Sequence, residues 1–202
     1  KPVQKSTAGS FRIHPFSKWK KIKNDYYDDR TGVLNQKVHD YLSPFASASV
    51  KLPLYVGAEA TAGRTHRFED SEITAIFEGL ERSCGIAPRG KQTVVHDSYR
   101  NLSESALHPE LVGTHSKEQY AMPNFPFQAF CSDKKINWVW GYSFQQQRPI
   151  LVPERLAYYS LGNDSGYVYE TSNGCSLGGC LEESIFHGIL EVMERDAFLL
   201  TW

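Results

Sequence analysis

Two carboxylates and a guanidinium recur at one spacing in two parts of this chain. The two trios are Glu78, Glu81 and Arg82, and then Glu191, Glu194 and Arg195. Each member of the second trio follows its counterpart by 113 positions. Residues three and four apart share one face of an α-helix, so each trio would point two acidic groups and one arginine in the same direction.

The second trio lies in an unusually apolar stretch. Between residues 182 and 200, large hydrophobic residues occur on nearly every side, which is typical of a helix covered by protein. One stripe of this predicted helix is polar, and it consists of Glu183, His187, Glu191, Glu194 and Arg195. A solvated face with internal ion pairs is one interpretation of such a stripe. His187 could equally be a hydrogen-bonded core residue.

The alternative interpretation is a metal and phosphate site. Buried carboxylates are costly unless a cation compensates them. Mg²⁺ is held by one or two carboxylates together with substrate phosphates, and arginine binds phosphate through two hydrogen bonds at once. Two such stripes facing each other would therefore suit a magnesium polyphosphate.

A Gly/Ser-rich turn precedes the second trio. Residues 172–180 lead from a predicted strand into the helix, which gathers free backbone N–H groups and the positive helix end at one point. The turn is no P-loop, because no Gly-Lys-Ser/Thr follows. Its position next to Glu183 and Glu191 nevertheless indicates a nucleotide-binding site.

These residues also carry a family resemblance. The run from Thr171 to Glu183, followed by the second trio, resembles the signature of the YcaO family. Within that family it is most similar to the azoline-forming cyclodehydratases of thiazole/oxazole-modified peptide biosynthesis, the streptolysin S type. Further matches follow in the same order at 29–33, 53–56, 63–82, 106–111, 138–143 and 152–153. The resemblance covers about residues 28–202.

The resemblance implies a site for ATP and Mg²⁺ between the two Glu-bearing helices. The implied magnesium ligands are Glu78, Glu81, Glu191 and Glu194. The implied ATP-binding residues are Ser176, Glu183, Arg82 and Arg195. Two departures stand out: the family often has Asn where this chain has Gly179, and the N-terminal Ser and Lys of some members have no counterpart near residues 28–31.

The implied reaction is ATP-dependent cyclodehydration of a ribosomally made precursor peptide. A substrate Cys, Ser or Thr side chain attacks the preceding amide carbon, the resulting oxyanion takes the γ-phosphoryl group, and loss of phosphate leaves a thiazoline or oxazoline. The peptide supplies the nucleophile, so no catalytic residue is assigned. The alternatives are a YcaO-type thioamide- or amidine-forming enzyme and a catalytically inactive peptide-binding scaffold subunit.

The resemblance also implies partners. They are the precursor peptide, an E1-like leader-binding protein, fused or separate, and a flavin-dependent dehydrogenase that oxidises the azolines. Family members continue past the second trio, so we expect the chain to be the N-terminal part of the YcaO domain. The apolar end at 198–202 would then need a partner or self-association into a homo-oligomer.

Composition excludes several function classes. The 202 residues carry 22 basic and 23 acidic side chains, so charge predicts neither a nucleic-acid nor a membrane partner. No hydrophobic run would span a bilayer, and the polar N-terminus is not a signal peptide, which predicts a cytoplasmic protein. The four cysteines form no Cys-x-x-Cys pair, which argues against a zinc ribbon and a disulfide scaffold.

The expected fold is α/β, with two related halves that each run from strands to a helix. Residues 1–24 are expected to form a basic N-terminal arm or linker, and 25–202 to belong to the YcaO domain. A solvated linker is favoured over an arm that docks an acidic partner. Helices are expected at about 68–86 and 181–200. Strands are expected at 33–41, 50–57, 92–99, 127–131, 136–143, 150–152 and 167–171.

Overall fold

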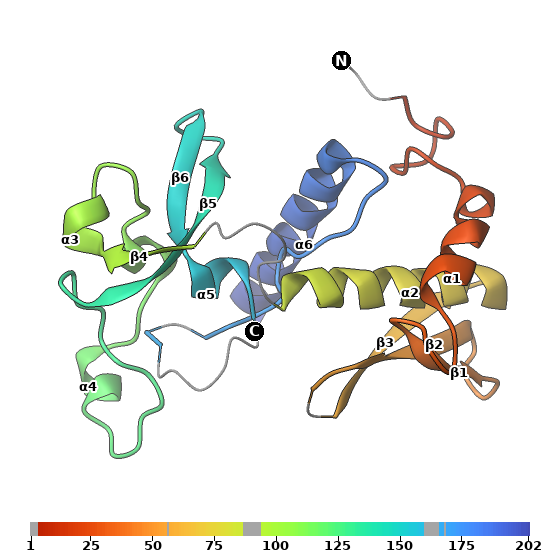
Figure 1. Ribbon diagram of the computed structural model, residues 1–202, viewed down its shortest axis with the longest axis horizontal. Helices are drawn as coiled ribbons and strands as arrows, with labels where there is room; N and C mark the ends of the chain where they lie inside the picture. The colour runs from red at the N-terminus through yellow and green to blue at the C-terminus, as the bar shows by residue number, and fades with distance from the viewer. Residues whose placement is uncertain (1–3, 56, 87–93, 160–165, 168) are drawn as a thin grey trace. The chain divides into compact units, whose positions relative to one another are not determined.

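The computed structural model describes residues 4–55, 57–86, 94–159, 166–167 and 169–202 (Figure 1). The chain forms two compact units: Lys1–Ser83 with Asn173–Trp202, and Cys84–Ser172. Among the residues that the structure describes, each unit contains a three-stranded antiparallel sheet whose strands follow each other in chain order. The predicted order of strands followed by a helix, twice along the chain, is confirmed.

The first unit is built on the sheet of β1 (Asn35–Asp40), β2 (Ala46–Pro53) and β3 (Ala58–Thr65), followed by helix α2 (Phe68–Gly85). Small residues let the helix approach the sheet closely. A Cβ at Gly63 would lie 2.1 Å from the carbonyl oxygen of Ser71, and the Thr61 hydroxyl donates to the carbonyl of Ala75 at 2.8 Å. The inward side chains of these elements form the core of this unit, with Val50 and Ile76 almost fully buried.

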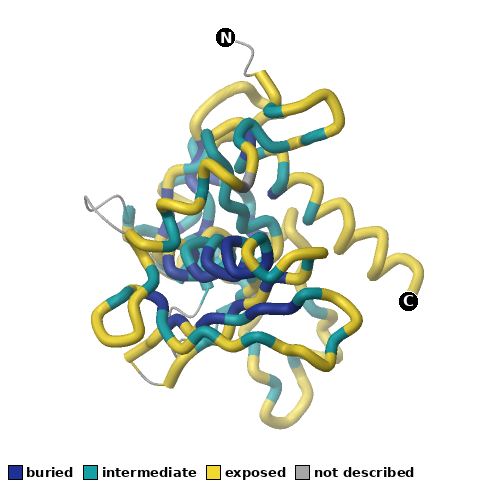
Figure 2. The backbone as a smooth tube through the Cα atoms, turned by 90° about the vertical axis from the view of Figure 1, so that its right-hand side faces the viewer, coloured by how far each residue is buried: buried dark blue, intermediate teal, exposed yellow. Residues whose placement is uncertain are grey.

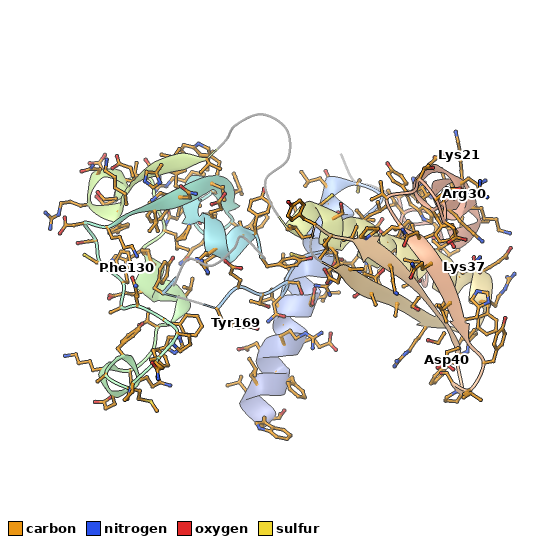
Figure 3. The ribbon with its side chains drawn as sticks, turned by 60° about the horizontal axis from the view of Figure 1, so that its bottom comes forward. Lys21, Arg30, Lys37, Asp40, Phe130 and Tyr169 are labelled. Carbon is orange, nitrogen blue, oxygen red and sulfur yellow. The ribbon has the colours of Figure 1, made fainter. Side chains whose placement is uncertain are left out.

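The N-terminal stretch is folded onto this unit. It forms η1 (Phe16–Trp19) and α1 (Lys20–Tyr26), and Trp19 packs edge-on against Phe77 of α2. Lys23 of α1 pairs with the buried Glu72, which also binds Lys37, labelled on β1 in Figure 3. The expectation of a solvated linker is therefore wrong for residues 16–26, because Trp19 packs on α2 and because Lys20 and Lys23 have acidic partners in the same chain. The boundary between 24 and 25 stays a prediction.

Helix α6 (Leu181–Thr201) begins after the Gly/Ser-rich turn. Glu182 and Glu183 lie in its first turn, where the positive end of the helix dipole favours negative charge. From Val192 onward its residues are exposed, as the yellow C-terminal helix in Figure 2 shows. None of the helices in the described part of the chain is both long and apolar enough to cross a membrane.

The second unit contains β4 (Val95–Ser98), β5 (Lys135–Ser143) and β6 (Arg148–Pro153). Its short helices are α3 (Tyr99–Leu102), η2 (Pro109–Val112), α4 (Lys117–Tyr120) and α5 (Glu154–Ala157). Trp138 is fully buried against Leu151 and Ala106, and its indole N–H donates to the carbonyl of Asp97 at 2.9 Å. The core of this unit therefore lies on the face of the sheet that carries Trp138.

Three strand predictions need correction. Strand β3 was missed, because its sequence of Ala, Thr and Gly carries no hydrophobic run. Residues 127–131, and the described residues of 167–171, form no strand. Their aromatic side chains pack together instead: Phe127 lies against Tyr169 and Phe130 against Tyr167, so the aromatic content reflects side-chain clustering. Gln92 and Thr93 of the strand predicted at 92–99 lie outside the described residues.

Candidate functional site

Glu78 is held on α2 by two neighbours. The backbone N–H of Ala62 on β3 donates to its carboxylate at 2.7 Å, and Arg82, one helical turn later, donates from Nη2 at 3.2 Å. Arg82 also lies 3.5 Å from a carboxylate oxygen of Glu59. The first trio therefore shares a face, as its spacing predicts, and β3 fixes its acidic side.

Glu81 lies one turn further in a more enclosed position. Burial raises the pKa of its carboxyl to about 7; Arg82 opposes this, while Glu191 and Glu78 add to it. The backbone N–H of Leu177, in the turn before α6, donates to the same carboxyl and favours its charged form. The two Glu-bearing helices thus bring Glu81 and Glu191 close enough for each charge to act on the other.

Glu78 and Glu81 line a cavity of about 220 Å³. The turn contributes Ser176 and Leu177 to its wall, and the remaining wall comes from Thr74, Phe77 and N-terminal residues between Ser6 and Trp19. The turn passes tightly over the start of α6, since a Cβ at Gly178 would lie 2.5 Å from the backbone nitrogen of Ser184. Backbone groups of the turn therefore lie beside the carboxylates.

Glu183 is buried and bonded within the protein. Arg12 donates from Nη1 to one carboxylate oxygen at 3.0 Å, and the backbone N–H of Ile13 donates to the other at 3.0 Å. Burial alone would raise the pKa of Glu183, but these donors and the N–H of Gly179 hold it below its ordinary value. A Cβ at Gly179 would lie 2.8 Å from the side chain of Ile13, so a larger residue there would require that side chain to move.

The second trio is less enclosed. Arg195 Nε lies 3.9 Å from Glu191 Oε1, Glu191 is half-buried, and Glu194 and Arg195 are exposed. Within the described ranges, no group of three or more His, Cys, Asp or Glu side chains is arranged to hold a metal ion. Electrostatics couples three of the four predicted magnesium ligands, Glu78, Glu81 and Glu191. The assignment of all four, and of the ATP-binding residues, stays a prediction.

Two neighbours of the site are not poised for chemistry. Burial and the charge of Arg12 lower the pKa of His187, which hydrogen-bonds to the backbone of Phe11. Burial, and then Glu81, raise the pKa of the Cys175 thiol. We interpret His187 as a neutral packing residue and Cys175 as a protonated thiol. Sequence reasoning missed the approach of Cys175 to Glu81 and the part that Arg12 plays beside Glu183.

The carboxylates are chemically suited to a hard divalent cation, but within the described residues they are not arranged around one. Carboxylate oxygens are the ligands that Mg²⁺ prefers, and the pKa of Glu81 is raised mainly by burial and further by Glu191 and Glu78, against the opposing charge of Arg82. A bound cation would remove that penalty. The backbone groups of the turn and the start of α6 would suit the phosphates that accompany Mg²⁺.

Comparison with known proteins identifies a family. A family model described as YcaO cyclodehydratase, ATP- and Mg²⁺-binding, matches residues 62–202. A search of curated proteins finds no significant match.

Solved structures share the fold. A heterocyclase in complex with substrate and cofactor matches with a TM-score of 0.75 and 22% identity over 95% of this chain. YcaO from Methanopyrus kandleri, bound with AMPPCP and Mg²⁺, matches with a TM-score of 0.67 and 20% identity over 93%. The heterocyclase TruD matches with a TM-score of 0.55 and 28% identity over 65%. This chain spans 28%, 44% and 21% of those chains, respectively.

Proposed function

The chain belongs to the YcaO family, and from that premise we propose that it carries the nucleotide-binding part of an ATP-dependent peptide cyclodehydratase. The substrate would be a ribosomally made precursor peptide whose Cys, Ser or Thr residues become thiazolines or oxazolines. An E1-like leader-binding protein, a flavin-dependent dehydrogenase and a second copy of the chain are the proposed partners.

One observation carries the proposal. Glu81 is a partly buried carboxyl with a pKa raised to about 7, and it lies beside Glu78 and Glu191 and beside the turn that opens α6. A protein that used this region only for stability would gain by replacing such a carboxyl with an uncharged residue. Its presence supports a cationic ligand in the cavity.

Each of the site residues would have a separate role. Glu78, Glu81, Glu191 and Glu194 would hold magnesium. Arg82 and Arg195 would fix these carboxylates or meet phosphate, and Ser176 would meet the nucleotide from the turn. Glu183, whose two oxygens are already bonded, would act by fixing the turn.

Bound ATP and Mg²⁺ would supply the phosphoryl group that makes the amide oxygen a leaving group, and the charge neutralisation for that transfer. This chain's contribution is to bind and orient. The basic side chains and backbone donors would hold the phosphates. The peptide's own side chain is the nucleophile.

Titration of ATP into the protein, with and without Mg²⁺, tests the binding half of the proposal. Saturable binding that requires Mg²⁺ is expected. Absence of binding in the complete natural protein would favour the scaffold alternative.

Mass analysis of the peptide product tests the chemical half. Cyclodehydration coupled to ATP turnover removes roughly 18 Da per ring. A gain of roughly 16 Da that depends on added sulfide would assign thioamide formation instead, and the nucleotide site would stand.

A further inference from the structure

Arg12 joins two parts of the site that are far apart in the sequence. Its Nη1 donates to the carbonyl oxygen of Leu177 at 3.0 Å and to Glu183 Oε1 at 3.0 Å. Ile13 adds its backbone N–H to the other oxygen of Glu183. One arginine therefore ties the N-terminal segment to the turn before α6 and to the first turn of that helix.

Leu177 connects this arginine to the acidic cluster. Its carbonyl accepts from Arg12, while its N–H donates to the carboxyl of Glu81. The two contacts lie on the two peptide groups that flank the Cα of Leu177, so Arg12 holds the residue whose N–H faces Glu81. Glu81 is thereby linked to Arg12 without any direct contact being needed.

Side-chain packing holds the N-terminal segment in this place. Phe11 stacks on Phe186 of α6 with 5.7 Å between ring centroids, and Trp19 contacts Phe77 of α2. Ile13 fills the space beside Gly179. Arg12 therefore lies in a segment that packs on both Glu-bearing helices. The segment is held by these packing contacts as well as by the hydrogen bonds of Arg12.

From this geometry we infer that Arg12 is a positioning residue for the Mg²⁺-nucleotide site: it fixes the turn at 176–179 through Leu177 and Glu183, so that the turn meets phosphate and supports Glu81. The inference rests on the proposed function for its ligand. Its structural part, the fixing of the turn, stands separately.

Two other roles for Arg12 make different predictions. As a direct phosphate ligand it would contribute independently of Glu183, whereas a positioning residue acts through Glu183 and the two should be energetically coupled. As a stability element only, its loss would lower the unfolding temperature and leave nucleotide affinity unchanged in the folded protein. Arginine and lysine also differ, because lysine places a point charge on a flexible stem, whereas the planar guanidinium of arginine is preorganised.

The first experiment is amide hydrogen exchange on the full chain without ligand, comparing the wild type with Arg12→Gln and Arg12→Lys. The exposed Arg30, labelled in Figure 3, gives the matched control Arg30→Gln in the same unit. Faster exchange at residues 176–179 is expected for Arg12→Gln, with partial protection restored by Arg12→Lys and no change for Arg30→Gln. Unchanged exchange at the turn in Arg12→Gln would overturn the inference, whatever the ligand proves to be.

The second experiment is a double-mutant cycle on Mg²⁺-ATP affinity with Arg12→Gln, Glu183→Gln and the double variant. Loss of a charge-assisted hydrogen bond predicts a drop in affinity of about tenfold for each single variant. The double variant should lose little more than either single one. Additive losses would contradict a positioning role and indicate that Arg12 binds the phosphates directly. Unchanged affinity in Arg12→Gln would show that Arg12 acts only on stability.

The two experiments separate the two proposals. If the wild type binds no Mg²⁺-ATP while the turn loosens in Arg12→Gln, the proposed function fails and the fixing of the turn by Arg12 holds. If the wild type binds Mg²⁺-ATP and the turn does not loosen, the proposed function holds and the role of Arg12 is rejected.

Discussion

Glu72 and Glu81 lie on the same helix, α2, and both are withdrawn from solvent, yet their surroundings differ. Glu72 is contacted by Lys23, Lys37 and His39, the last at 2.6 Å. Burial would raise its pKa, but these three partners hold it below the ordinary value. At Glu81 burial raises the pKa to about 7; Arg82 opposes this shift, and Glu191 and Glu78 add to it.

The difference separates a structural carboxylate from a candidate binding group. A protein can stabilise a buried carboxylate by surrounding it with donors and cations, as it does at Glu72. It has not done so at Glu81, which lies against a cavity. Residues with perturbed pKa values in clefts are often functional, because a ligand supplies what the protein lacks.

The largest expected effect is a loss of affinity for Mg²⁺-ATP. Glu191→Gln keeps the shape of the side chain but removes the charge nearest Glu81 on the other helix, so Mg²⁺-dependent ATP binding should weaken by at least about a hundredfold. Calorimetric titration measures the change. The control is Glu182→Gln, at an exposed position in the first turn of α6. Equal affinities in both variants would show that the charge of Glu191 is not needed for binding.

Glu72→Gln should instead act on stability. It leaves Lys23 and Lys37 without their acidic partner and should lower the free energy of unfolding by about 2 kcal/mol, allowing for the solvent that reaches these lysines. Urea unfolding at neutral pH measures this. ATP affinity should not change in the folded variant. A large loss of affinity would contradict the purely structural role of Glu72.

The pH dependence of stability should follow the same contrast. Because the folded pKa of Glu72 is lowered, its contribution is present above the unfolded pKa and is lost as pH falls through the folded value. The penalty of Glu72→Gln should therefore shrink between neutral pH and about pH 3. A penalty that stays constant over this range would show that the ion pairs are not its source.

Glu81→Gln should stabilise the protein in the absence of ligand. The folded pKa of Glu81 is raised to about 7, so its charged form costs stability as pH rises from the unfolded pKa through 7. The gain should be about 1 kcal/mol at pH 8, after discounting for the solvent that reaches this half-buried group, and should vanish near pH 4. Thermal unfolding at the two pH values measures it, and destabilisation at pH 8 would oppose the assignment.

The smallest effect is expected at the protein surface. Lys20 pairs with Glu69 at 3.2 Å, and both side chains are more than half exposed. Lys20→Gln should change the free energy of unfolding by no more than about 0.5 kcal/mol. A cost like that of Glu72→Gln would show that α1 is attached mainly through exposed pairs rather than through Glu72 and Trp19.

The sequence was informative where the signal is local. The Glu/Arg spacing predicts a shared helix face, and the Gly/Ser-rich run predicts the turn before α6. The sequence could not distinguish Glu72 from Glu81, because the cations that separate them come from α1 and β1 and meet α2 only in the folded chain. Arg12 was missed for the same reason, since its partners lie more than 160 positions away. Strand β3 was missed because helix packing there selects small residues.

The most direct test of the site is the number of protons released when Mg²⁺-ATP binds. A carboxyl with a pKa of about 7 is about half protonated at pH 7, and it must lose that proton to hold a cation. Calorimetric titration of preformed Mg²⁺-ATP in buffers of different ionisation enthalpy should therefore show about 0.5 proton released per site by the wild type at pH 7, falling toward zero at pH 8.5. Glu81→Ala, at a protein concentration high enough to retain measurable binding, should release none. Tight binding by the wild type without proton release at pH 7, or with the same release from Glu81→Ala, would contradict the assignment of Glu81 to the metal site.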